Sequence, residues 1–212
     1  VLADGTAGPT AALVALDNVG IEPGVDAAGD SFDTVTLNAV PAISAAAVDL
    51  EHDELELLGA AMAAMAVAGA FEGALKMCVS YSQDRIAFGR PIAKFQAVQH
   101  LLARLAEETA AVVAAAASAA FALEQANRPS AAFVDIASAK IRAGEAVNEG
   151  GLIAHQVHGA IGFTADHPLH RYVQRMWAWR DQFGREAQWA ERLGRHFAAQ
   201  GGDAFWKTIT AA

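Results

Sequence analysis

The sequence contains a single cysteine, few basic residues and little charge of either sign. One cysteine, Cys78, excludes an internal disulfide framework and is typical of a protein from the reducing cytoplasm, which is where we expect this chain to reside. Lys and Arg number 15 against 24 Asp and Glu, which gives a formal net charge of −9. A nucleic-acid partner requires clustered basic residues, so we expect none. Because 54% of the residues are apolar and 18% are charged, the composition also excludes a disordered chain.

Long runs of strongly apolar residues are also missing. Residues 57–71 and 109–123 are apolar but dominated by Ala and Gly, and both are shorter than the ~20 residues that span a bilayer. We therefore expect two core helices and no membrane span. The neighbours of Cys78, which include Leu75 and Met77, likewise indicate a buried helical position rather than a reactive thiol.

Residues 1–50 contain short β-type runs separated by Gly, Asp and Pro. Residues 11–16 form one such run. Residues 32–40 form another, because their apolar side chains approach the alternation of a half-buried strand. Two strands do not make a stable sheet alone, and the first residue is Val. We therefore expect residues 1–50 to be the incomplete end of a β-domain from a longer natural chain.

From Asp53 onward, apolar residues recur at helical spacing. Asp53 and Glu56 resemble a capping box at the start of a first helix that ends near residue 83. Residues 84–90 indicate a turn, and Pro91 suits the first position of a second helix, which ends near residue 127. The first two long helices are therefore predicted to be antiparallel, joined through residues 84–91.

Three further helices are predicted. Ser130 is placed to cap a third helix that extends to about His158, despite the helix-destabilising pair Gly150-Gly151. A glycine-containing loop at residues 159–167 precedes a fourth helix, and a fifth follows at residues 184–199. Long helices with short connections predict a bundle over residues 53–200, with residues 201–212 as a tail. The expected fold class is mainly α, with a β-domain remnant at the N-terminus.

Two short motifs stand at helix ends. The first is DRIAFGRPI at residues 84–92, followed by Phe95 and Gln96. Taken alone, this motif is explained as a helix C-terminus at which Arg85 interacts favourably with the helix dipole. The second is QVHGAIGF at residues 156–163, in which two glycines permit a ligand or another segment to approach the backbone closely. It is not the dinucleotide-binding fingerprint, because no strand precedes it and the third glycine is missing.

In this order and spacing, the two motifs resemble the C-terminal domain of the acyl-CoA dehydrogenases, flavin enzymes that desaturate acyl-CoA thioesters at the α and β carbons. The family patterns are Arg-x-x-Phe-Gly, a Phe-Gln or His-Gln pair, and Gln-x-x-Gly-Gly-x-Gly-[Phe/Tyr]. The resemblance covers about residues 53–200 and, more loosely, residues 1–50 as the end of the middle β-domain. It implies a subunit of an FAD-dependent acyl-CoA dehydrogenase, with an acyl-CoA substrate and an electron-transferring flavoprotein as acceptor. It also implies a dimer of dimers, formed with itself or with a homologous subunit.

The resemblance further implies which residues bind FAD. The guanidinium of Arg85 would contact the pyrophosphate of a cofactor held mainly by a neighbouring subunit, as suits its planar fork of donors. The glycine motif would cover the adenosine end, although Ala160 replaces the family's usual second glycine. The residues implied to bind the cofactor are Arg85, Phe88, Gln96, Gln156, Gly159 and Gly162.

The family's catalytic base is a glutamate, and this chain lacks it at both usual positions. Counting from the glycine motif, the usual position is Phe183, just before Gly184. In members that carry the base on the first helix of the bundle, the position corresponds to Gly59. The catalytic residue is therefore unknown, and two hypotheses stay open. Either the base has moved, with Glu186 as the first candidate ahead of Asp181 and Glu56, or the chain is a non-catalytic structural subunit of a heteromeric enzyme.

Histidines and arginines form two further groups. His155 with His158 and His167 with His170 have a spacing that metal sites use. The chain has no Glu-x-x-His element, so the di-iron ligand set of helical bundles is incomplete and we expect no metal. Six arginines and three tryptophans in the last two predicted helices indicate an amphipathic surface or a subunit interface.

Overall fold

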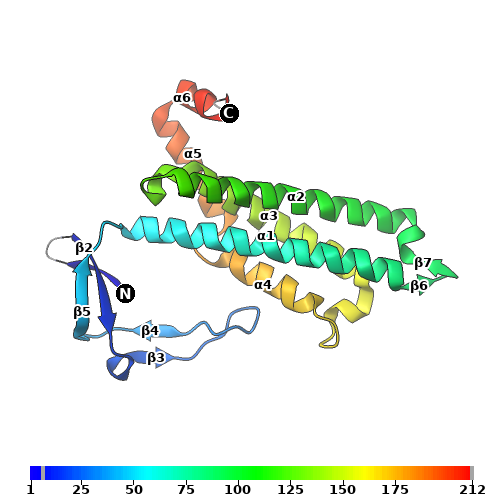
Figure 1. Cartoon of the computed structure of the whole chain (residues 1–212), viewed down its shortest axis with the longest axis horizontal. Helices are drawn as coiled ribbons and strands as arrows, with labels where there is room; N and C mark the ends of the chain where they lie inside the picture. Colours follow the sequence, from blue (N-terminus) through cyan, green and yellow to red (C-terminus); the bar gives the residue numbers. More distant parts are fainter. Residues whose placement is uncertain (6–7, 211–212) are drawn as a thin grey trace.

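The computed structural model describes residues 1–5 and 8–210 and consists of a small β region beside a long helical bundle (Figure 1). Three antiparallel strands form one sheet in the order β1-β2-β5, and β3 and β4 form a separate antiparallel pair. The strands are β1 (Leu2–Gly5), β2 (Gly8–Val14), β3 (Gly20–Glu22), β4 (Thr34–Thr36) and β5 (Ala42–Ala47).

One of the two predicted strands is confirmed and the other is wrong in extent and burial. β2 covers most of the predicted run at residues 11–16. The predicted half-buried strand at residues 32–40 is reduced to β4, which is three residues long and exposed throughout. Its alternating pattern fails to give a buried face because β4 pairs with β3 alone and no second layer of the described chain covers it.

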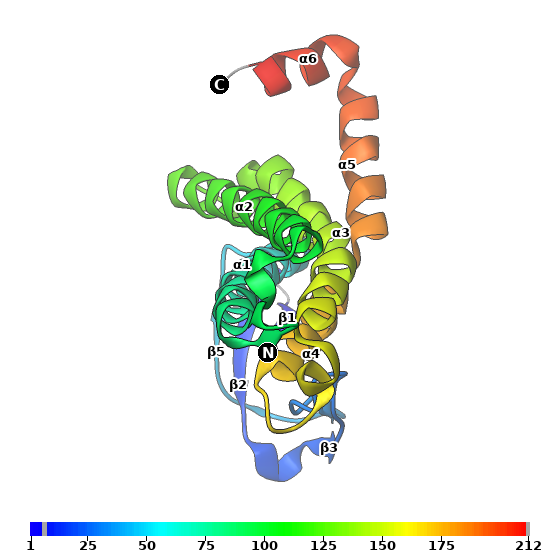
Figure 2. The ribbon, with the colours of Figure 1, turned by 90° about the vertical axis from the view of Figure 1, so that its right-hand side faces the viewer.

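The first four helices, α1 to α4, pack side by side with alternating direction, and α5 and α6 turn away from them (Figures 1 and 2). This confirms the predicted mainly α fold. The residues expected to be a tail contain a helix, α6. The helices are α1 (His52–Asp84), α2 (Gln96–Gln125), α3 (Phe133–His158), α4 (Leu169–Asp181), α5 (Glu186–Gln200) and α6 (Gly202–Thr210).

The predicted antiparallel pair formed by the first two long helices is also confirmed. A hairpin of β6 (Ile86–Ala87) and β7 (Arg90–Pro91) interrupts the helical path between α1 and α2. One short 3-10 turn, η2 (Ile92–Lys94), leads into α2, and another, η3 (Pro129–Ala132), leads into α3. The chain reverses at both places, so α1 and α3 run in the same direction.

The two predicted helix caps are wrong, because a local capping box of Glu51 and Glu54 starts α1 two residues earlier and a tertiary contact binds the Ser130 side chain. α1 begins at His52, and the N–H of Glu51 donates to Oε2 of Glu54 at 3.1 Å. Ser130 does not cap α3, since its Oγ donates to Oε1 of Glu54 at 2.7 Å. Arg128 adds two donors to the same carboxylate at 3.0 and 2.7 Å, and these bonds lower the pKa of Glu54 well below its usual value. This buried carboxylate therefore ties the start of α1 to the α2–α3 connection.

Small residues allow the helices to approach closely. The fully buried ring of Phe71 on α1 lies against Gly150 on α3, where a Cβ atom would fall 2.6 Å from Cζ of the ring. The neighbouring Gly151 faces Val173 on α4, with 3.1 Å between its hypothetical Cβ and Cγ1. Each glycine costs about 1 kcal/mol of helix stability relative to alanine. The glycine pair is therefore present because the packing of α3 against α1 and α4 requires it.

By length and composition alone, both α1 and α2 are apolar enough to cross a membrane. In α1, 61% of the apolar window is buried against other helices, which is the environment of a core helix. In α2, 28% is buried. α2 therefore leaves part of an apolar face without a partner in the described chain.

We predict that Gly150→Ala destabilises the bundle by about 1–3 kcal/mol, because the added methyl group overlaps the Phe71 ring. Gly69→Ala is the matched control, since it makes the same exchange within a helix but no atom lies within 4 Å of the added Cβ. Helix propensity alone should make Gly69→Ala neutral or stabilising by up to about 1 kcal/mol. Urea unfolding followed by circular dichroism measures both, and equal effects of the two substitutions would refute the packing explanation.

Candidate functional site

The antiparallel order of the helices brings the two sequence motifs to one end of the bundle (Figure 1). α1 ends at Asp84 just before the hairpin, and α3 ends at His158 just before the 3-10 turn η4 (Gly159–Phe163). The rings of Tyr81 and His158 stack with centroids 4.6 Å apart, which ties the two helix ends together. We call this region, which holds all six residues implied to bind FAD, the cofactor end.

The hairpin at the cofactor end holds a strained residue. Phe88 and Gly89 form its two-residue loop with φ of +50° and +78°, the conformation of a type I′ turn. Positive φ is unfavourable for a bulky side chain, and such strain persists where the surrounding structure imposes it, frequently at functional sites. The ring of Phe88 is 96% exposed and touches Phe95 edge-on with centroids 6.1 Å apart. The hairpin therefore presents an aromatic surface outward.

Three polar side chains implied to bind the cofactor have no partners within the described part of the chain. Eight of the eleven arginines form ion pairs with carboxylates, and Arg90 lies over the ring of Phe95. Arg85 does neither and is exposed. Gln96, the first residue of α2, and Gln156 near the end of α3 are also exposed, and their amides bond to no described residue. A guanidinium fork and two free amides fit a phosphorylated, hydrogen-bonding ligand.

The two glycines of the second motif have different environments. Gly159 adopts φ +64°, and nothing lies within 4 Å of an added Cβ, so its backbone is open to a ligand. Gly162 is buried, and a Cβ there would lie 3.0–3.2 Å from His158, Leu169 and His155. Gly162 therefore permits close packing of the loop on α3 and α4, and its position does not expose it to a cofactor.

A groove of about 540 Å³ adjoins the cofactor end between α2 and α3. Gln156 lines it, together with Leu101, Leu152 and the ion pair of Arg104 and Glu149. Apolar side chains flanked by a few polar groups are typical of small-molecule sites. The groove is therefore large enough and suitably lined to receive part of a cofactor next to Gln156.

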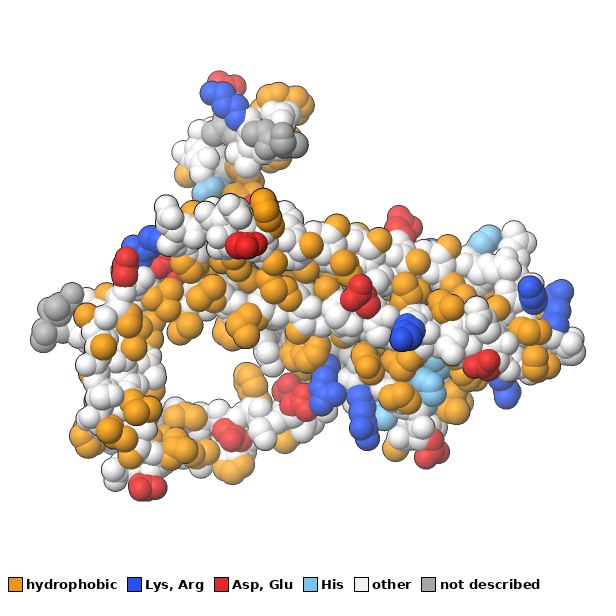
Figure 3. All heavy atoms as spheres, viewed as in Figure 1, with side chains coloured by type: hydrophobic (Ala, Val, Ile, Leu, Met, Phe, Trp, Pro, Cys, Tyr) orange, Lys and Arg blue, Asp and Glu red, His pale blue; other side chains and the backbone are white. Residues whose placement is uncertain are grey.

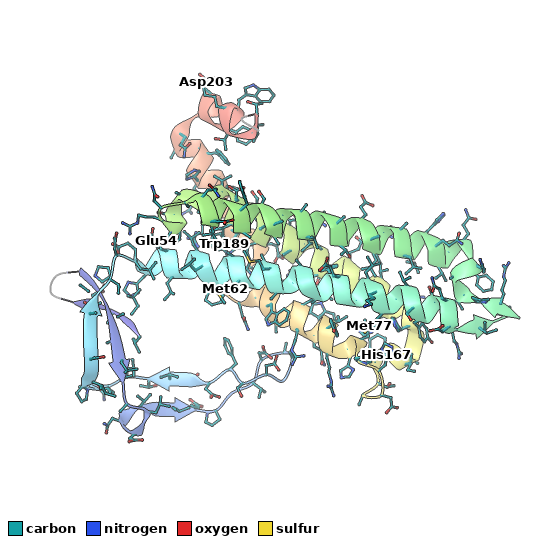
Figure 4. All side chains as sticks on the ribbon, in the orientation of Figure 1. Glu54, Met62, Met77, His167, Trp189 and Asp203 are labelled. Carbon is teal, nitrogen blue, oxygen red and sulfur yellow. The ribbon has the colours of Figure 1, made fainter. Side chains whose placement is uncertain are left out.

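The two positions implied for a catalytic base meet at the opposite end of the bundle. Phe183 follows α4, and Gly59 lies on α1. A Cβ atom at Gly59 would fall 2.5 Å from Cζ of Phe183, so the ring occupies the space of the missing side chain. The indole of Trp189 (Figure 4) donates from Nε1 to the Phe183 carbonyl oxygen at 2.8 Å, and this side chain is fully buried. Phe183 has φ +54°, so it is a second strained aromatic residue.

Three carboxylates near Phe183 are candidates for a relocated base, and each is paired with an arginine: Glu186, Asp181 and Glu56. Glu186 accepts from Nε of Arg180 at 2.9 Å and packs against Gly144 of α3, and the Arg180 bond lowers its pKa below the usual value. A lower pKa makes the carboxylate a weaker base. Asp181 pairs with Arg185 at 2.6 Å, and Glu56 pairs with Arg192 at 2.8 Å. The structure therefore brings the two base positions together, and all three candidate carboxylates near them are paired with arginines.

An opening separates this end of α1 from the β region, and hydrophobic side chains border it (Figure 3). Met62, which is 70% exposed, lies on α1 beside it (Figure 4). Asp30 bridges part of the gap by a two-bond ion pair with Arg175 of α4 at 2.8 and 2.9 Å. The ion pair joins the β3–β4 connection to the bundle at this point.

The cofactor end and the base position are too far apart for one short contact network. Arg85, directly after α1, follows Gly59 by 26 positions. At 1.5 Å per residue the separation is about 39 Å, more than the diameter of a small domain. The arrangement agrees with the implied role of Arg85 toward a cofactor held mainly by another subunit.

Two features escaped the sequence analysis. Lys140 is buried in α3 and its Nζ donates to the carbonyl oxygens of Trp179 and Arg180 at 2.9 Å each, which caps α4 just before Phe183. Burial lowers the pKa of Lys140 to about 8. A lysine among alanines on a helix face was the available signal.

The second feature is the burial of His155 and His158. Among residues 1–5 and 8–210, no three His, Cys, Asp or Glu side chains are placed to hold a metal ion.

Comparison with known proteins supports one family. The family model described as "Acyl-CoA dehydrogenase, C-terminal domain" matches residues 57–187. Acyl-CoA dehydrogenase IpdE2 of Mycobacterium tuberculosis is 36% identical over 107 residues, which cover 50% of this chain and 31% of that protein. This chain therefore spans about a third of that relative's length.

Two solved structures have the same arrangement. The Tcur3481-Tcur3483 steroid ACAD G363A variant matches 94% of this chain and 55% of its own with a TM-score of 0.79 and 30% identity. The ChsE4-ChsE5 complex of Mycobacterium tuberculosis matches 95% of this chain and 56% of its own with a TM-score of 0.76 and 26% identity. Both matches extend beyond the bundle into the β region.

We predict that Gly59→Ala and Phe183→Ala are energetically coupled, because the methyl group added at position 59 must displace the Phe183 ring. Gly59→Ala should lower the free energy of unfolding of the parent by about 1 kcal/mol. In the Phe183→Ala background it should not lower it, so the coupling between the two substitutions should be at least about 0.5 kcal/mol. A double-mutant cycle of urea unfolding measures it. Additive effects would show that the ring does not occupy the Gly59 space.

Proposed function

Because this chain belongs to the acyl-CoA dehydrogenase family, we propose that it is a subunit of an FAD-dependent acyl-CoA dehydrogenase that binds cofactor but supplies no catalytic base. The contact between Phe183 and Gly59 carries this proposal. It places an aromatic ring where the resemblance requires a carboxylate. The substrate of the assembled enzyme would be an acyl-CoA thioester, and an electron-transferring flavoprotein would accept the electrons.

The cofactor end fits FAD. The unpaired guanidinium of Arg85 would bind the pyrophosphate, and the exposed Phe88 ring and Gln96 amide would border it. Gln156 and the open backbone at Gly159 would cover the adenosine portion, next to the groove between α2 and α3. The isoalloxazine of bound FAD supplies the hydride acceptor in this family. The contribution of these residues is to hold and orient the cofactor.

The base position does not fit proton abstraction. A general base must lie within about 2.6–3.2 Å of the proton-bearing atom, or reach it through one water. The Phe183 ring cannot accept a proton, and its contact with Gly59 excludes a side chain from the first helix. The ion pairs of Glu186, Asp181 and Glu56 would have to break before any of these carboxylates could take over. A non-catalytic role is therefore favoured over a relocated base.

The exposed face of α2 supports assembly with another subunit. Ala110, Ala114, Ala117 and Phe121 recur at intervals of four, three and four residues, and all four are exposed. The three alanines at this spacing permit close packing of a second helix, and the Phe121 ring adds apolar surface to the same face. Both of the similar solved structures pair two differently named components. We propose a homologous subunit that carries the glutamate as the partner of this chain.

We predict that Arg85→Ala weakens FAD binding by the assembled protein roughly 10- to 100-fold, since a hydrogen bond to a charged group contributes about 1.5–3 kcal/mol. The thermal unfolding midpoint should stay unchanged, because Arg85 is exposed and pairs with no described residue. Arg171→Ala is the matched control, as the other arginine without a carboxylate or ring partner in the described chain. Flavin content after gel filtration measures the effect, and equal flavin content in all three proteins would contradict the assignment.

The absence of a base predicts that this chain alone does not bleach flavin when acyl-CoA is added. Bleaching should appear after reconstitution with a homologous subunit that carries the glutamate, and Glu186→Gln should change its rate less than about twofold. Asp181→Asn serves as the control for loss of an arginine pair near Phe183. Bleaching by the chain alone that Glu186→Gln abolishes would instead establish a relocated base.

A further inference from the structure

Four histidines gather where the glycine loop, residues 159–167, folds against the bundle. His155 and His158 lie on the last turns of α3, His167 ends the loop (Figure 4) and His170 lies on α4. The rings of His155 and Phe163 stack with centroids 3.9 Å apart. The rings of His158 and His167 are 4.6 Å apart. Imidazole rings of α3 therefore make direct contacts with both the middle and the end of the loop.

Two of these imidazoles are buried with a nitrogen left unpaired. His158 is 3% exposed, and its Nδ1 lies 2.9 Å from the Ala154 carbonyl oxygen. A carbonyl oxygen accepts, so Nδ1 carries the proton, and Nε2 has no partner in the described chain. His155 is 7% exposed, and its Nδ1 is likewise unpaired. An unpaired nitrogen is tolerable on a neutral ring, but protonation would turn it into a buried donor on a cation.

The described residues around His155 and His158 offer no anion to a protonated ring. From α1, His158 meets the Cys78 thiol, with 3.8 Å between Sγ and Nδ1, and the Tyr81 ring. Burial raises the pKa of Cys78 to about 12, so the thiol stays neutral. From the loop and α4, the facing titratable groups are His167 and His170, which repel a cation when charged.

The nearest carboxylates belong to neighbouring surfaces. Asp84 lines a shallow surface groove with Tyr81 and His167, and Asp166 is exposed on the loop. No contact joins either carboxylate to His155 or His158 within residues 1–5 and 8–210. A charge on either buried ring would therefore be both desolvated and uncompensated, which is costly.

We propose that His155 and His158 form a pH-sensitive latch that holds the glycine loop against the bundle while both rings are neutral and releases it when they are protonated. The closed contact consists of the stack of Phe163 on His155 and the tilted contact of the His167 ring with the His158 ring. Release would break these contacts and let water reach the unpaired nitrogens. The hinge would lie at Gly159, where φ is +64° and no side chain restricts the backbone.

The direction of the pH dependence follows from where the protons bind. Burial lowers the pKa of both histidines below the ordinary 6.5 when the loop is closed. The open form recovers the ordinary value, so it binds more protons below pH 6.5. The closed form is therefore fully favoured above pH 6.5 and loses stability as the pH falls below it. Between pH 7.5 and pH 5.5, each histidine should shift the equilibrium toward the open form by up to roughly tenfold.

The latch concerns the order of the loop and does not require FAD. Its consequence for the cofactor rests on the proposed function, in which Gln156 and Gly159 cover the adenosine portion. Loop release at low pH would then lower FAD retention. The two ideas are separable, because hydrogen exchange reports the loop and flavin content reports the cofactor.

The test is hydrogen exchange of the full chain at pH 7.5 and 5.5, followed by mass spectrometry of peptides that cover residues 159–167. Protection factors corrected for intrinsic exchange should fall at least about tenfold in the parent at pH 5.5. In His155→Phe/His158→Phe, which keeps stacking rings but removes both titrating groups, they should fall less than about threefold. His100→Gln, an exposed histidine on α2, is the control and should behave as the parent.

Unchanged protection in the parent would overturn the latch, and so would an equal fall in the double variant. If the double variant does not fold, the single variants decide, because each should remove about half of the logarithmic change. Loop opening at pH 5.5 with full FAD retention would leave the latch standing and contradict the proposed role of the loop. Loss of FAD at pH 5.5 without loop opening would contradict the latch and leave the proposed function standing.

Discussion

The close approach of α3 to α1 and α4 is the constraint on which the rest of the structure depends. It is possible because Gly150 and Gly151 leave room for Phe71 and Val173, so that rings and branched side chains fill the space a methyl group would occupy. With alanine there, the helices would have to separate, and the packing along the whole length of α1 would loosen. The same close packing aligns the helix ends, and each end of α1 carries one of the two functional positions.

The two ends of α1 are built in opposite ways. At the cofactor end, Phe88 is held at positive φ and its ring is almost wholly exposed, while Arg85 and the nearby amides have no partners in the described chain. At the other end, Phe183 is also held at positive φ, but its ring is turned onto Gly59 and its carbonyl oxygen is bonded by Trp189. One end is therefore prepared to receive a ligand, and the other is closed by the protein's own side chain.

Arginines make the same distinction between the two ends. Near Phe183 they neutralise the carboxylates that would be required for a relocated base, and the Arg180 pair lowers the pKa of Glu186. At the cofactor end, the guanidinium of Arg85 is left free. Lys140 strengthens the closed end, because it caps the carbonyl groups of α4 immediately before the turn that carries Phe183. The pairing of arginines near Phe183 and the lack of a pair at Arg85 therefore decide which end of α1 keeps a charged side chain for a ligand.

Local patterns in the sequence determined the helices, the break between the first two, and the family, because helical periodicity and the two motifs are properties of adjacent residues. They also placed Arg85 and Gly159 at helix ends, since caps and glycines act within a few residues. They failed at Ser130, at Glu56 and along residues 32–40, where Glu54 or the absence of a covering layer decided the outcome. The tertiary structure alone decided that Phe183 fills the space at Gly59, that His155 and His158 are buried without partners, and that Glu186 faces Arg180. These contacts join residues from different helices, and their energies depend on distance and burial, which the order of residues along one helix does not specify.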